Sequence, residues 1–97
     1  MIKVVIERHL KAGKRGEFIH MLKELSTAAI HQRGYVSGET LSSIDDASII
    51  SVLSMWQSLE DWKAWEASEP RLKLEERVEP LLLENPKVTV YQVMATE

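Results

Sequence analysis

The feature that most constrains the fold of this chain is the order in which two hydrophobic periods alternate along it. Four segments carry strand patterns, which predict strands at residues 2–9, 35–42, 49–56 and 87–94; apolar and polar residues alternate most clearly in the first, and the third is apolar on both faces. Between the first two strands, and again between the last two, apolar residues recur at every third or fourth position. This spacing predicts amphipathic helices at residues 14–31 and 58–82.

The second helical segment carries its own start and stop signals. Ser58, followed three residues later by Asp61, matches a capping box at a helix start. Pro70 stops or restarts the helix, and Pro80 bends the apolar stripe that follows it, because proline lacks the backbone N–H that a helix interior needs.

The order strand, helix, strand, strand, helix, strand consists of two split βαβ units. Right-handed crossovers place both helices on the same face of one antiparallel sheet. We therefore predict an α+β fold, a ferredoxin-like βαββαβ sandwich with a four-stranded antiparallel sheet. Its 97 residues allow one modest core, so residues 1–97 are expected to form a single domain.

Two helices cover only one face of this sheet, yet the strands carry apolar side chains on both. Along residues 49–56, Ile49, Leu53 and Met55 alternate with Ile50, Val52 and Trp56, a pattern typical of a strand buried on both faces. A bare apolar face exceeds what monomers normally expose. A standard interface buries about 800 Å² on each partner, and about half of that area is apolar. At ~25 cal/mol/Å², burying the apolar area of both partners contributes on the order of 20 kcal/mol of gross stabilisation.

That gain is larger than most estimates of the association cost, about 4–15 kcal/mol. We therefore predict a homodimer in which the two helix-free sheet faces meet. The alternative is a bent sheet whose back is covered by loops.

Composition narrows the function classes. The chain has no cysteine, which excludes disulfides, thiolate catalysis and cysteine-ligated metals. Its net charge of −3 argues against nucleic acid and anionic membranes as partners. No apolar run approaches the length of a membrane span, and the first residues are too alternating for a signal peptide, so a cytoplasmic protein is expected.

The chain start, residues 2–8, and the stretch from Trp56 to Ser68 resemble the antibiotic biosynthesis monooxygenase domain family. The shared motif is a tryptophan that ends the third strand, a capped helix and an aromatic residue on that helix, and the resemblance covers essentially the whole chain. It implies a dimeric α+β barrel with a pocket between sheet and helices. It also implies one of three functions: cofactor-independent oxygenation of a polycyclic aromatic or quinol, heme degradation, or no catalysis.

The heme-degrading members of that family carry an asparagine on the first strand, a tryptophan on the second helical segment and a histidine that binds iron. Trp65 matches the tryptophan, whereas Glu7 and Glu75 stand at the other two positions. A carboxylate is a poor substitute for imidazole on heme iron. The resemblance therefore favours a cofactor-free reading, with neither a cofactor nor a metal expected.

Three residues are the candidates for the site. Glu7 lies near the end of the first strand and, if it points into the helix-side pocket, is the candidate base for a phenolic substrate. Trp65, placed at the pocket by the family resemblance, is expected to stack on a flat substrate. Tyr91 on the last strand is a candidate hydroxyl in the same cavity.

Each of these assignments has a plainer alternative. For Glu7 it is pairing with a lysine or arginine at the rim, and for Trp65 and Tyr91 it is packing in the core. The function therefore stays open between a small cofactor-independent monooxygenase and a non-catalytic dimeric module that binds a hydrophobic ligand, with heme degradation third. His9, His20 and His31 show no spacing that selects one of them for catalysis or metal binding.

Overall fold

A computed structural model describes all 97 residues of the chain. The elements follow in the predicted order: β1 (Ile2–His9), α1 (Arg15–Ala29), β2 (Tyr35–Ser42), β3 (Ile49–Trp56), α2 (Leu59–Glu66), α3 (Glu69–Val78), the short 3₁₀ turn η1 (Glu79–Leu81) and β4 (Lys87–Gln92). The sheet has the strand order β2-β3-β1-β4, and every neighbouring pair is antiparallel. The predicted ferredoxin-like α+β fold is confirmed.

The second helical segment is divided more sharply than its apolar stripe suggested. The helix that begins after Ser58 ends at Glu66, and α3 begins three residues later, at Glu69, with Pro70 in its first turn. Proline is well tolerated there because its missing N–H would have no partner inside the helix. Pro80 lies in the 3₁₀ turn that follows α3, so the bend falls where it was predicted.

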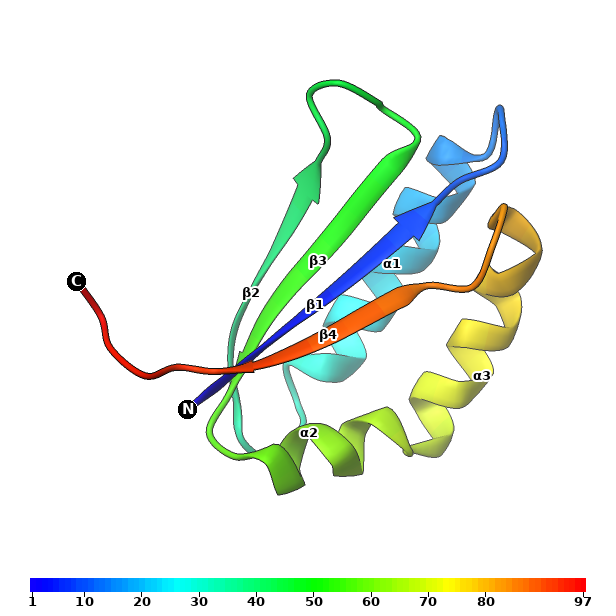
Figure 1. The fold of residues 1–97 in the computed structure, drawn as a ribbon. Coiled ribbons are helices and arrows are strands. Elements are labelled where there is room, and N and C mark those ends of the chain that lie inside the picture. The colour runs from blue at the N-terminus through cyan, green and yellow to red at the C-terminus, as the bar shows by residue number, and fades with distance from the viewer.

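All three helices cover one face of the sheet (Figure 1). The side chains of β1 alternate accordingly. Ile2, Val4, Ile6 and Arg8 are buried on the helix side, while the odd-numbered residues point to the other face. Phe18 and Leu22 of α1 and Trp62 of α2 pack onto the buried side. None of the helices combines the length and apolar character that crossing a bilayer would need.

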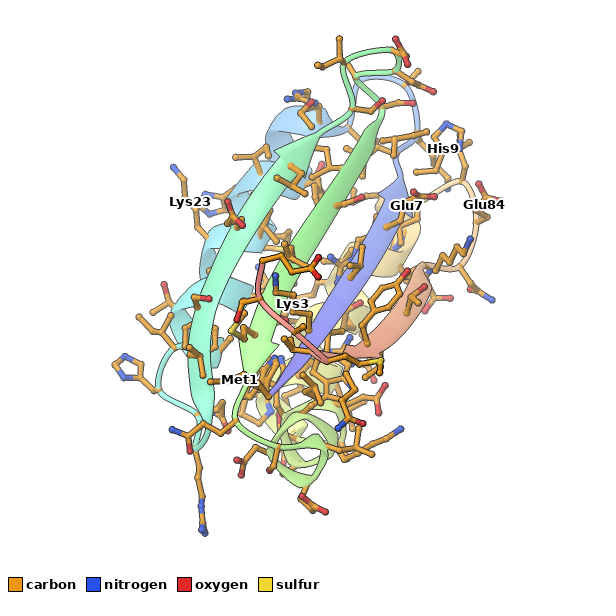
Figure 2. The ribbon with its side chains drawn as sticks, turned by 60° about the vertical axis from the view of Figure 1, so that its left-hand side comes forward. Met1, Lys3, Glu7, His9, Lys23 and Glu84 are labelled. Atoms are coloured by element: carbon orange, nitrogen blue, oxygen red, sulfur yellow. The ribbon has the colours of Figure 1, made fainter.

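The opposite face of the sheet has no helix over it. Figure 2 shows Lys3, Glu7 and His9 of β1 on this face. The register places Val5 beside Leu53 of β3 in the middle of it. This helix-free face therefore combines apolar residues at its centre with charged residues around them.

The chain ends in a tail that leaves the body of the domain on the helix-free side (Figure 1). The Val93 N–H donates to the Met1 carbonyl at 3.1 Å, the last backbone hydrogen bond of this region. Beyond it, Met94 is 94% exposed. The tail therefore has an apolar side chain with nothing in its own chain to pack against.

Candidate active site

A cavity of about 170 Å³ lies between the helix side of the sheet and the three helices. Ile6, Val52 and Trp56 from the strands form its floor, and Leu22 and Leu25 of α1 form one wall. It opens between α1 and β2, where the lining residues are exposed: Ser26, Gly38 and Thr40. An apolar cavity of about 150 Å³ holds one benzene ring, so the volume here suits a single aromatic ring.

Indole rings form much of the cavity wall. Trp65, predicted to lie at the pocket, is among the lining residues and is 5% exposed. Trp62 lies beside it, with its ring centroid 6.0 Å from that of Trp56. The Trp56 Nε1–H donates to Ser54 Oγ at 3.0 Å, whereas the buried Trp62 Nε1–H has no acceptor.

The tyrosine that lines the cavity is Tyr35 and not the predicted Tyr91. Its ring packs edge-on against Trp56, with centroids 5.5 Å apart. A Cβ at Gly38 would lie 2.7 Å from the Tyr35 hydroxyl oxygen, so glycine at this position leaves room for the hydroxyl beside β2. The hydroxyl therefore lies near the mouth of the cavity.

Three charged side chains meet in the cavity. Arg8 donates from Nη2 to the Oε1 atom of Glu75 in a short charge-assisted hydrogen bond. The Nη2 atom of Arg71 lies 3.9 Å from the same oxygen. The side chains of Arg8, Arg71 and Glu75 are only 2%, 11% and 20% exposed. β1 and α3 thus build a largely buried cluster of two cations and one anion.

Both guanidinium groups also lie over aromatic rings. Arg8 is 5.6 Å from the centroid of Phe18, and Arg71 is 5.4 Å from that of Trp62. Burial lowers the pKa of the Arg8 guanidinium below its ordinary value, and the neighbouring Glu75 carboxylate opposes this shift. Arginine nevertheless stays protonated in proteins, so the cluster keeps both positive charges.

The three site residues predicted from the sequence, Glu7, Trp65 and Tyr91, do not lie together in the structure. Glu7 is exposed on the helix-free face, paired in the ladder with Ser51 and Lys87 (Figure 2). Tyr91 pairs with Lys3 on that same face and is 54% exposed. Neither lines the cavity, so the expectation that they share it with Trp65 is wrong. The strands stay regular to their ends, and the strict alternation keeps both side chains on the far face.

The position that aligns with the heme-binding histidine holds Glu75, which Arg8 and Arg71 already engage. These residues do not suit heme iron, because the only side chain at the ligand position is a carboxylate paired to two cations. Of the histidines, His20 and His31 are exposed, and His9 lies outside the cavity with its Nδ1 atom 3.1 Å from Glu84 (Figure 2).

Sequence reasoning missed Arg8, Arg71 and Glu75 as members of one cluster. A signal for Arg8 was present, because it follows Ile2, Val4 and Ile6 at every second position and so belongs to the buried stripe. A charged residue in such a stripe needs a buried partner. Nothing in the sequence identified that partner, which lies 67 residues away on α3.

The comparisons with known proteins agree with this architecture. The family model described as "Antibiotic biosynthesis monooxygenase" matches residues 1–81. The chain belongs to this family. No curated protein matches it significantly.

Solved structures show the same fold at low identity. A conserved protein from Methanosarcina mazei Go1 is 18% identical with a TM-score of 0.89, over 94% of this chain and 90% of that one. Rv0793 from Mycobacterium tuberculosis is also 18% identical with a TM-score of 0.89, over 98% and 96% of the two chains. SnoaB, a cofactor-independent oxygenase from Streptomyces nogalater, is 15% identical with a TM-score of 0.84, over 98% and 95%.

Proposed function

We propose that this member of the antibiotic biosynthesis monooxygenase family is a cofactor-independent monooxygenase that acts on a small aromatic or quinol-type substrate in the cavity between helices and sheet. The observation that carries the proposal is a cavity of one-ring size, walled by Trp62 and Trp65, with ionised groups inside it. SnoaB, which has the same fold, is a cofactor-independent oxygenase.

The volume of the cavity favours a single-ring substrate over a polycyclic one. A volume of about 170 Å³ is only slightly larger than that of an apolar cavity of about 150 Å³ that binds one benzene molecule. Indole faces on the wall favour a flat, electron-rich ring by stacking. A monocyclic quinol therefore fits better than a fused ring system.

Oxygenation without a cofactor requires that the substrate itself supply the electrons. One oxygen atom of O₂ enters the product and the other leaves as water, after the substrate has lost a proton to a base. Glu75 lines the cavity with a side chain that is 20% exposed, so we assign it the role of proton acceptor in place of Glu7. Loss of this proton leaves a substrate carbanion, and the wall of the cavity keeps water away from it while it reacts with O₂.

Oxygen uptake with a panel of monocyclic and polycyclic quinols tests this proposal. We expect uptake with the monocyclic compounds, a loss of about a hundredfold or more in Glu75→Gln, and slower turnover in Trp65→Leu. Glu7→Gln is the matched control and is expected to leave the rate unchanged, because Glu7 lies on the opposite face of the sheet. Circular dichroism must show that each variant is folded.

Two results would contradict the proposal. The absence of oxygen uptake with every quinol, combined with saturable binding of a hydrophobic compound, would favour the non-catalytic ligand-binding module. Full activity of folded Glu75→Gln would remove Glu75 as the base.

We also propose that the partner of this chain is a second copy, bound through the helix-free sheet face. Val5 and Leu53 at the centre of that face and the exposed Met94 of the tail support this arrangement. The cavity lies on the other side of the sheet, so each subunit would keep its own site.

A further inference from the structure

The charged cluster of the cavity carries a net positive charge, and Glu39, the other charged residue of the lining, is exposed and forms no ion pair with it. Arg8 and Arg71 contribute two positive charges and Glu75 one negative charge, which leaves an excess of one. Neither guanidinium has a second carboxylate within ion-pair distance. An unbalanced charge in a site shielded from water is unfavourable unless another group compensates it.

Two buried N–H donors of the same region also lack an acceptor. They are Nε of Arg8 and Nε1 of Trp62, in side chains that are about 2% exposed or less. Both residues line the cavity, and the ring of Trp62 lies beneath the Arg71 guanidinium. Buried donors are nearly always paired in folded proteins, so unpaired ones in the wall of a cavity are available to a ligand that brings acceptor oxygens.

We propose that the substrate of this cavity is an aromatic carboxylate, whose carboxylate accepts hydrogen bonds from Arg8 and Arg71 while its ring lies against Trp62 and Trp65. This inference deepens the proposed function and rests on it in taking the cavity as the substrate site. The carboxylate supplies the one missing negative charge. It also anchors the ring beside Glu75.

The chemistry of the cluster favours a carboxylate over other anions. A planar carboxylate matches the fork of a guanidinium and forms paired hydrogen bonds with it. A phosphate ester carries close to two negative charges at neutral pH and would overcompensate an excess of one. A phenol is mostly neutral at that pH, because its ordinary pKa is about 10.

The test compares the binding of benzoate and of benzamide, its neutral analogue of nearly the same shape, by calorimetry in the absence of oxygen. We expect benzoate to bind about tenfold tighter or more, as a charge-assisted hydrogen bond implies. Arg71→Met should abolish this preference, and Arg71→Lys should restore part of it. Arg77→Met is the matched control, since Arg77 lies on the same helix but is exposed and pairs with Glu24.

Equal affinity for the two compounds in the wild type, or a preference that persists in folded Arg71→Met, would overturn the inference. Its failure can be told apart from that of the proposed function. If quinols are oxidised but benzoate binds no more tightly than benzamide, this inference is overturned and the proposed function stands. A benzoate preference that Arg71→Met abolishes supports it even if no quinol is oxidised.

Discussion

The least expected residue of the molecule is Arg8, a charged side chain that is 2% exposed in the middle of an apolar core. Its position is stabilised by the charge-assisted hydrogen bond to Glu75 and by the face of Phe18. Removing one partner of such a pair leaves the other charge buried and alone. That loss is far more destabilising than replacing both partners by apolar residues.

We therefore expect Glu75→Gln to lower the free energy of unfolding by about 3 kcal/mol. The double variant Arg8→Met/Glu75→Leu should lose less, because it removes the most deeply buried charge together with its partner and leaves only the 11% exposed Arg71 without a carboxylate. Urea denaturation measures both. Glu76→Gln, the exposed neighbour, serves as the control and should change stability by less than about 0.5 kcal/mol. A double variant that is as unstable as Glu75→Gln would contradict this account.

At the scale of elements, the start of α2 is fixed by contacts with the loop that follows α1. Ser58 Oγ accepts from the Asp61 N–H at 3.2 Å, the first half of the predicted capping box. The Asp61 side chain does not close the box but faces Arg33 and Gly34. The Gln57 N–H donates to the Gly34 carbonyl at 2.8 Å. The loop that follows α1 and the first turn of α2 therefore stabilise each other beside Trp62.

Gly34 has φ +82°, and a Cβ there would overlap the Asp61 side chain. Gly13 has a similar φ of +77° but open space around it. Gly13→Ala should therefore cost about 1 kcal/mol from the left-handed backbone alone, and Gly34→Ala distinctly more. Thermal unfolding of both variants measures the difference. Adding Asp61→Ala to Gly34→Ala should recover only part of the excess, because the Cβ of residue 61 would still lie 2.5 Å away. Equal losses at the two glycines would argue against the overlap.

At the scale of the whole molecule, the two faces of the sheet have different roles. The helix side encloses the cavity, while the other side has Val5 and Leu53 at its centre and no helix over it. The C-terminal tail leaves the domain on this side (Figure 1). The proposed dimer would bury this surface and give Met94 something to contact. The stability of the dimer would then depend on Val5 and Leu53 at the centre of this face.

A charge at that centre should separate the subunits. We expect the wild-type chain to sediment as a dimer and Leu53→Glu to weaken association by at least about a hundredfold, because an unpaired carboxylate would be buried in the interface. Leu72→Glu, on an exposed position of α3, is the control and should remain dimeric. A folded wild-type monomer at micromolar concentration would disprove the proposed interface.

The sequence by itself determined the order of the strands and helices, the bounds of the first three strands, the fold class and the residues on each face of β3. These features follow from local periodicity, which every residue expresses together with its near neighbours. The same alternation, applied strictly, would also have placed Glu7 on the far face and Arg8 inside.

Only the tertiary structure decided which side chains share the cavity. Arg8 comes from β1, Trp65 from α2, and Arg71 and Glu75 from α3, so their meeting depends on how the helices lie across the sheet. Periodicity assigns a side chain to a face but not to a partner far away in the chain. A buried charge is tolerated only where such a partner is found, and packing alone determines where that is.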